Sequence, residues 1–203
     1  MRRLVVLTAV ILGLAATGPA FGQDRFEALK AMLAKSDCTR FEFISVLISD
    51  VFDAVDSTSG VALIAADGRY RVDINDDRYL YDARHLYSYS RENNQVVIEE
   101  PDSDFVFGNQ ISFITRLDEF YHSRIIEPDS DYWLVRKEAV RGNMPDSMTI
   151  RIEPEALKIR FIEYYDVNDE LTRILIKKQE TGLDCSPKNF EPAFPDSVER
   201  VRL

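Results

Sequence analysis

The chain has 203 residues, of which 30% are charged, and its formal net charge is −10 at pH 7. This acidic balance argues against nucleic acid as a partner, and against docking on anionic lipid by charge alone. A chain of this length can form a single domain with a sizeable core.

Residues 1–22 have the pattern of a signal peptide. A short basic start precedes an apolar run over residues 4–16, which is too short to span a bilayer. The small residues Ala20 and Gly22 stand at the −3 and −1 positions of a cleavage site. We therefore expect cleavage near Gly22 and an exported, soluble protein with one domain over residues 23–203. No other segment is apolar enough to cross a membrane, and no cysteine follows the cleavage site to carry a lipid anchor.

The two cysteines, Cys38 and Cys185, stand near opposite ends of the mature chain. In an oxidising compartment, a disulfide between them is favoured over two free thiols. Closing so long a loop would stabilise the fold by about 5 kcal/mol in the chain-entropy model. A metal site is disfavoured, because two sulfur ligands without a nearby cluster of His or Cys fall short of a zinc site.

The first half of the mature chain predicts one helix and then a series of strands. Apolar Phe26, Leu29 and Leu33 recur at helical spacing and indicate an amphipathic helix over residues 25–35. After this helix the apolar period changes to two, and turn residues separate the short apolar stretches. The expected strands cover residues 39–48, 60–66, 69–74, 78–82, 85–90 and 95–99. The acidic and small residues 50–59 are expected to form a loop.

The second half interrupts the strands with a helix. Residues 105–120 return to helical spacing, and the charged stretch that follows is expected to be the tail of this helix. Strands then resume over residues 132–140, 147–153, 157–165 and 171–178.

These elements predict a mainly β protein with helices (α+β), built on a single curved antiparallel sheet. Such a sheet has to cover its apolar face. A closed barrel, an unclosed barrel under the helices, or a sandwich would each achieve this. A central helix rich in phenylalanine suits the unclosed barrel, which it and the N-terminal helix would cover as a lid.

The sequence offers little catalytic chemistry. His85 and His122 have no partner at metal-ligand spacing, and we expect them at surface or capping positions. No nucleophile elbow, phosphate-binding glycine loop or zinc signature occurs. The Asp-rich stretches 102–104 and 129–131 lack the glycine-turned loop of a calcium site. We therefore expect a protein that is not an enzyme and that needs no cofactor and no metal.

Three stretches occur in the order and spacing of one known family. Residues 66–73 are Ala-Asp-Gly-Arg-Tyr-Arg-Val-Asp, residues 80–89 are rich in Leu and Tyr and precede Gln95, and Phe190 precedes the Pro-Asp-Ser-Val run at 195–198. They resemble, in turn, three motifs of the outer-membrane lipoprotein carrier proteins (LolA type). These motifs are the Arg-Pro-Gly-Lys-Phe-Arg-Trp-Glu segment, the Asp-Gly-x-x-Leu-Trp-x-Tyr strand pair with its later glutamine, and the Phe…Pro-x-Gly-Val ending. The likeness spans nearly the whole mature chain.

The resemblance implies an unclosed β-barrel with helices as a lid, and an apolar cavity that holds the acyl chains of lipoproteins. It implies a periplasmic carrier, which we expect to be a monomer. Such a carrier takes lipoproteins from an inner-membrane ABC-type release complex and delivers them to an outer-membrane acceptor. Acyl chains can be carried without covalent chemistry, because each buried methylene contributes about 0.8 kcal/mol. The residues expected to line the cavity are Phe43, Tyr70, Val72, Ile74, Leu86, Phe113, Ile114, Leu117 and Phe161.

The chain also departs from the family pattern. Ala66 stands where the family has an arginine that is tied to closing the lid. Asp67, Val72 and Ser197 stand where it has proline, tryptophan and glycine. Three alternatives to a carrier therefore remain. One is a lipid- or lipoprotein-sensing regulatory module on the same fold, resembling periplasmic regulators that restrain anti-sigma factor cleavage. The second is a periplasmic enzyme with a polar cluster in its cavity, and the third is a sheet that packs a core without any cavity.

Overall fold

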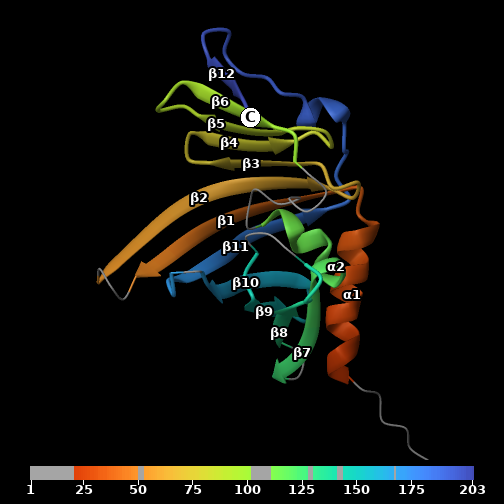
Figure 1. Ribbon diagram of the computed structural model, residues 1–203. Helices are drawn as coiled ribbons and strands as arrows, with labels where there is room; N and C mark the ends of the chain where they lie inside the picture. The colour runs from red at the N-terminus through yellow and green to blue at the C-terminus, as the bar shows by residue number, and fades with distance from the viewer. Residues whose placement is uncertain (1–20, 50–52, 102–110, 128–129, 141–143, 167) are drawn as a thin grey trace, which may run out of the picture.

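The computed structural model contains one open, curved sheet of twelve strands with helices against one of its faces (Figure 1). It describes residues 21–49, 53–101, 111–127, 130–140, 144–166 and 168–203. The strands are β1 Cys38–Ser49, β2 Ala54–Ala65, β3 Tyr70–Ile74, β4 Asp77–Tyr81, β5 Leu86–Ser90, β6 Gln95–Glu99, β7 Tyr121–Glu127, β8 Asp131–Arg136, β9 Ser147–Glu153, β10 Lys158–Tyr165, β11 Leu171–Thr181 and β12 Glu199–Arg202. The helices are α1 Phe21–Lys35 and α2 Leu117–Phe120, and the 3₁₀ turns are η1 Ser112–Thr115 and η2 Pro187–Phe190.

The sheet is built from two antiparallel meanders that join along β1. The order of strands across it is β12-β6-β5-β4-β3-β2-β1-β11-β10-β9-β8-β7. β1 pairs with β2 from Cys38 opposite Ala65 to Ser49 opposite Ala54, and it pairs with β11 on its other side. Neighbouring strands are antiparallel except β12 and β6, which run parallel. Because β12 and β7 form opposite edges, the sheet does not close, and the prediction of an unclosed, mainly β fold is confirmed.

The expectation of a loop over residues 50–59 is wrong, because β2 already begins at Ala54. Residues 50–52 lie outside the described part of the chain. Val55, Asp56 and Ser57 are all exposed, since this end of β2 extends past the core and is held by its pairing with β1. A strand that buries neither face has no apolar alternation, and its sequence therefore resembles that of a loop.

The expected helix over residues 105–120 is seen only in part, because residues 105–110 lie outside the described residues. From residue 111 onward the segment forms two short pieces, η1 and α2. The expected charged tail of this helix is instead the edge strand β7, on which His122 lies. Its side chains after Tyr121 are exposed. An edge strand that buries almost nothing can be polar throughout, which hid it from the hydrophobic pattern.

The main core lies between the inner face of the sheet and the helices. Phe26, Leu29 and Leu33 of α1 are at most 2% exposed, which confirms the predicted amphipathic helix. Phe26 stacks on Tyr132 of β8 with ring centroids 4.3 Å apart. Figure 1 shows the sheet curving around α1 and α2. The curved sheet and α1 therefore enclose the apolar side chains from two sides.

The residues from 183 to 198, here called the C-terminal strap, cover the outer face of the β2–β6 half. Phe190 packs with Leu63 and Ala65 of β2. Phe194 lies between the rings of Tyr87 and Tyr89, at centroid distances of 5.9 and 5.4 Å. The strap leads into β12, whose four residues pair with β6 at the edge of the sheet. This half is therefore packed on both of its faces.

The predicted disulfide is confirmed. Cys38 at the start of β1 is bonded to Cys185 in the strap, and their Cα atoms are 5.2 Å apart. Cys38 is fully buried beside Leu63 and Phe190. The bond fastens the strap to the outer face of the sheet at the point where β11 ends.

Gly60 of β2 lies directly under the ring of Phe43 in β1. A Cβ atom at position 60 would lie 2.5 Å from Cζ of Phe43 and 2.9 Å from the carbonyl oxygen of Asp73. The absence of a side chain thus lets the Phe43 ring pack closely against β2 inside the main core.

Gly60→Ala is expected to lower the free energy of unfolding by about 1–3 kcal/mol, because the added methyl group overpacks the core. Urea unfolding measures this change. The matched control is Ser59→Ala at the exposed neighbouring position, which we expect to stay within about 0.5 kcal/mol of the wild type. Equal free energies of unfolding for the two variants would contradict overpacking, because they would mean that the Phe43 ring shifts without destabilising the fold.

Candidate functional site

The candidate site is the apolar interior between the sheet and the short pieces η1 and α2. Eight of the nine predicted cavity residues meet there, contributed by β1, β3, β5, η1 and α2. They are Phe43, Tyr70, Val72, Ile74, Leu86, Phe113, Ile114 and Leu117. Seven of them are at most 4% exposed, and Ile74 is partly buried. The structure therefore brings the strand set and the helical set together, while their contact with acyl chains remains a prediction.

The interior also contains residues that the sequence analysis placed in a helix but not in the site. Phe26, Leu29 and Leu33 of α1 belong to the same cluster as the eight residues above. Tyr121, the first residue of β7, lies against Phe113 with ring centroids 5.8 Å apart. The helical spacing of the α1 residues was the signal for their shared face. Nothing local indicated that this face meets the sheet at this place.

Phe161 does not lie in this interior. It is half-buried, and its ring lies under the guanidinium groups of Arg151 and Arg173, at 5.1 and 5.6 Å from its centroid. The reason is a bulge in β10, where Arg160 is an extra residue relative to β9. Ile159 faces the core before the bulge and Ile162 faces it after the bulge. The bulge thus reverses the alternation and turns Phe161 to the outer face.

The pieces η1 and α2 form the lid of the interior, and polar contacts tie this lid to α1 and to the end of β8. Lys30 of α1 contacts Asp118 of α2 at 2.6 Å and Glu27 at 2.8 Å. Burial lowers the pKa of Lys30, but the hydrogen bonds to Asp118 and Glu27 outweigh this effect and raise it above the ordinary value. The backbone N–H of Lys137 donates to the carbonyl oxygen of Phe120 at 2.9 Å. These polar contacts of the lid lie near the surface, while its apolar side chains Phe113, Ile114 and Leu117 are buried in the main core.

Arg116 of the lid lies close to the turn between β2 and β3. Its Nη1 atom would be 3.3 Å from a Cβ atom at Gly68, whose φ of 91° also favours glycine. Arg116 pairs with Glu119, and this hydrogen bond raises the pKa of the guanidinium. Ala66, at the position of the family arginine, is exposed in the same turn. In this chain an arginine therefore approaches the turn from the lid.

The interior holds a few buried hydroxyl groups. Tyr121 donates a hydrogen bond to the carbonyl oxygen of Pro145 at 3.0 Å. Burial raises the pKa of Tyr121 and of Tyr164, so both phenols stay neutral. The Thr115 hydroxyl in η1 is buried and has no hydrogen-bond partner among the described residues. These neutral groups could orient the polar end of a ligand, but they provide no nucleophile paired with a base.

A hollow of about 850 Å³ opens beside this interior, where the β8–β9 connection meets the end of β10. Met144, Met148 and Tyr164 line the hollow and also belong to the main core cluster. On the solvent side it is lined by Trp133 and Tyr165, which are 39% and 62% exposed. Methionine side chains are unbranched and adapt their shape to a neighbour. The hollow therefore borders the main core at Met144, Met148 and Tyr164, and charged residues, among them Arg136, Asp146 and Glu163, line it as well.

The other candidate residues lie apart from this interior. His85 is in the turn before β5, with Nε2 at 3.4 Å from Glu100, and His122 is exposed. Within the described ranges, no group of three or more His, Cys, Asp or Glu side chains could hold a metal ion. In the same residues, no helix is both long enough and apolar enough to span a membrane.

The comparisons with known proteins concern the fold. No protein-family model matches the sequence, and no curated protein matches it. The chain is similar to the structure of an uncharacterized conserved protein from Thermus thermophilus, with 10% identity and a TM-score of 0.54 over 89% of this chain and 98% of that chain. It is also similar to a LolA superfamily protein from Nitrosomonas europaea, with 11% identity and a TM-score of 0.48 over 85% of this chain and 98% of that chain. The likeness to the Thermus thermophilus structure shows a shared fold.

A third similar structure is the MucA/MucB complex of Pseudomonas aeruginosa. The identity is 12% and the TM-score 0.36, over 84% of this chain and 61% of that chain. In the present chain an open sheet curves around α1 and a short lid, as the sequence resemblance implied.

Proposed function

We propose that this protein is a periplasmic carrier that holds the acyl chains of lipoproteins in the interior under η1 and α2. It would receive lipoproteins from an inner-membrane ABC-type release complex and pass them to an outer-membrane acceptor. The observation that carries this proposal is the convergence of side chains from the sheet and the lid on one apolar interior beside a methionine-lined hollow. The compartment is supported by the signal-peptide pattern of residues 1–22 and by the Cys38–Cys185 disulfide.

The interior supplies apolar surface rather than reactive groups, so the proposed activity is binding and not catalysis. Burial contributes about 0.8 kcal/mol for each methylene, and several methylenes are enough for reversible carriage. Release requires the lid to part from the sheet. The contact between Lys30 and Asp118 opposes this motion only weakly, because the Asp118 side chain is 68% exposed to water. Opening would also expose Phe113, Ile114 and Leu117, which are at most 2% exposed, so in this proposal the binding of a partner supplies the free energy for it.

The test is titration of the delipidated mature protein with a synthetic peptide that carries a triacylated N-terminal cysteine. The same peptide without acyl chains is the control. We expect the acylated peptide to bind at least tenfold more tightly, because only its chains can enter the apolar interior. Calorimetry or a fluorescent label on the peptide measures both affinities.

Equal binding of the two peptides would contradict acyl recognition and would favour a regulatory module that binds protein segments. Binding of neither peptide would mean that the interior is a packed core.

A regulatory module remains the second candidate, and the edge strand β7 favours it. Ile125 and Ile126 are 44% and 54% exposed there, and Trp133 of the neighbouring β8 is exposed beside them. An exposed apolar edge can accept an extended segment of another protein as an additional strand.

A further inference from the structure

A second hollow, of about 550 Å³, lies between β10 and β11, away from the lid. It is lined by five basic side chains and one carboxylate, which are Arg151, Lys158, Arg160, Lys177, Lys178 and Glu153. The whole chain has a net charge of −10, so this hollow is a local positive region on an acidic protein. Such a reversal of sign favours an anionic ligand at this place.

The hollow exists because two bulges face each other across the sheet. Arg160 is an extra residue in β10 relative to β9, and Lys177 is an extra residue in β11 relative to β1. The pairing between β10 and β11 runs from Tyr165 to Phe161 and ends there, opposite Leu175. The two bulge residues thus stand on either side of the gap that the strands leave.

Gln179 holds this gap open in a defined shape. Its side-chain oxygen accepts a hydrogen bond from the backbone N–H of Ile159 at 3.0 Å, and its side-chain nitrogen donates to the carbonyl oxygen of Leu157 at 3.4 Å. Gln179 is only 6% exposed. A side chain of β11 therefore replaces the missing backbone pairing and keeps the strands apart.

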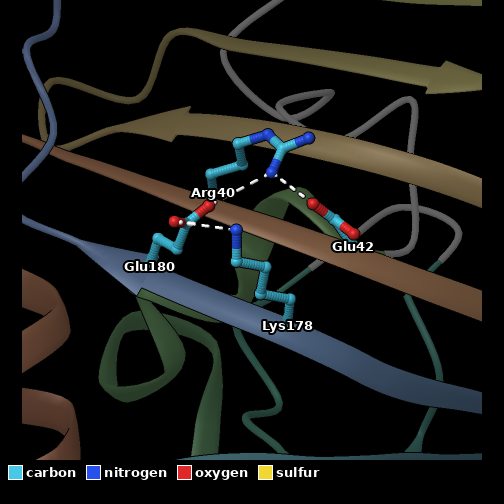
Figure 2. Close-up of polar contacts among 4 residues, drawn as sticks. All are labelled: Arg40, Glu42, Lys178 and Glu180. Atoms are coloured by element: carbon cyan, nitrogen blue, oxygen red, sulfur yellow. Dashed lines mark hydrogen bonds and ion pairs between the residues drawn. The ribbon is translucent and has the colours of Figure 1, made fainter.

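Some of the basic groups around the hollow are already neutralised. Arg151 pairs with Asp131, and this hydrogen bond lowers the pKa of the Asp131 carboxyl, which therefore stays charged. Lys178 forms an ion pair with Glu180 (Figure 2). Arg40 also pairs with Glu180, and it pairs with Glu42 as well.

The remaining basic groups of the hollow lack an ion-pair partner within the described part of the chain. Lys158, Arg160 and Lys177 have no ion pair among the described residues, and all three are exposed. These three groups are therefore available to a ligand.

Apolar side chains adjoin these free charges. Phe161 and Leu175, which are cross-strand partners, line the hollow and are half-buried on the outer face. Basic groups beside apolar side chains are complementary to a ligand that has both an anionic group and short apolar parts. An extended acidic peptide would not contact the apolar side chains of Phe161 and Leu175.

We propose that this hollow binds the phosphate group of an anionic phospholipid between Arg160 and Lys177, with the glycerol end of its chains on Leu175, beside Phe161. Guanidinium and ammonium groups are the usual protein partners of phosphate oxygens. The site lies outside the interior under the lid, and it stands whether or not the proposed carrier function holds. The net charge of the protein argues against general attraction to anionic lipid, so binding here depends on the local cations.

The experiment is calorimetric titration with dihexanoyl phosphatidylglycerol below its micelle-forming concentration. Dihexanoyl phosphatidylcholine has the same chains with a zwitterionic head, and we expect it to bind at least tenfold more weakly. Arg160→Gln combined with Lys177→Gln should weaken phosphatidylglycerol binding at least tenfold and leave the unfolding temperature unchanged, because both side chains are exposed. The matched control combines Arg84→Gln with Lys188→Gln, which are exposed elsewhere and should change the affinity less than twofold.

Three results would overturn the proposal. Phosphatidylglycerol binding that survives the Arg160 and Lys177 changes would place the lipid elsewhere, for example in the interior under the lid. Binding of inorganic phosphate that depends on these residues, without binding of the lipid, would assign the hollow to free phosphate. Tighter binding of hexaglutamate than of phosphatidylglycerol would assign it to an acidic protein segment.

Discussion

Replacing Cys38 and Cys185 together by serine is expected to lower the free energy of unfolding by about 5 kcal/mol. The bond joins residues that are 147 positions apart, so its loss gives the unfolded chain a large gain in conformational freedom. It also releases the C-terminal strap, whose Phe190 packs on the buried Cys38 region. Urea unfolding of the wild type and the double variant measures the difference.

The control for the disulfide is Ser186→Ala, beside Cys185, which should stay within about 0.5 kcal/mol of the wild type. Thiol titration of the denatured, non-reduced wild type should find no free thiol. Two free thiols in protein isolated from the periplasm, or a loss of less than about 1 kcal/mol in the double variant, would contradict a stabilising disulfide.

Leu117→Glu is expected to reduce the affinity for a fluorescent fatty acid at least tenfold while lowering the free energy of unfolding by less than about 2 kcal/mol. Leu117 is 2% exposed and begins the four-residue helix α2. Its neighbours Asp118 and Glu119 are exposed, so a small rotation of this short helix brings the new carboxylate to solvent. The variant would then lose the apolar lid surface without burying a charge.

The matched control is Leu29→Glu in α1. Leu29 is fully buried in a fifteen-residue helix that cannot turn its face away from the sheet. We expect this variant to lose several kcal/mol, because it buries a charge in the core. If Leu117→Glu costs as much as Leu29→Glu, and the wild type binds no fatty acid, then the interior is a packed core and holds no ligand.

The sequence predicted the parts of the fold in which a periodic pattern meets a buried face. The helical spacing of Phe26, Leu29 and Leu33 predicted α1, and the alternation of Tyr70 and Val72 predicted the buried face of β3. These residues lie in the main core. Where an element buries one face, its local pattern of apolar residues was therefore sufficient to predict both the element and its buried face.

The remaining features depend on contacts between distant segments. The bulge at Arg160 reversed the side on which Phe161 was expected, and no local pattern reveals such an extra residue. The first half of β2 and the residues of β7 after Tyr121 are largely exposed, so neither stretch presents the alternation that identifies a half-buried strand. The parallel pairing of β12 with β6 joins segments about a hundred residues apart, which the chain reaches only through the strap.

The C-terminal strap also determines the direction from which other molecules can approach. It covers the outer face of β2–β6, and the inner face of β2 and β3 contributes Ala62, Ile64, Tyr70 and Val72 to the main core, so less of this half is open to other molecules. The methionine-lined hollow, the basic hollow and the edge strand β7 all belong to the half from β7 to β11. In the proposed transport, a donor and an acceptor would have to occupy this same half. The donor and the acceptor would therefore bind the carrier one after the other. The cargo would pass without a ternary complex of donor, carrier and acceptor.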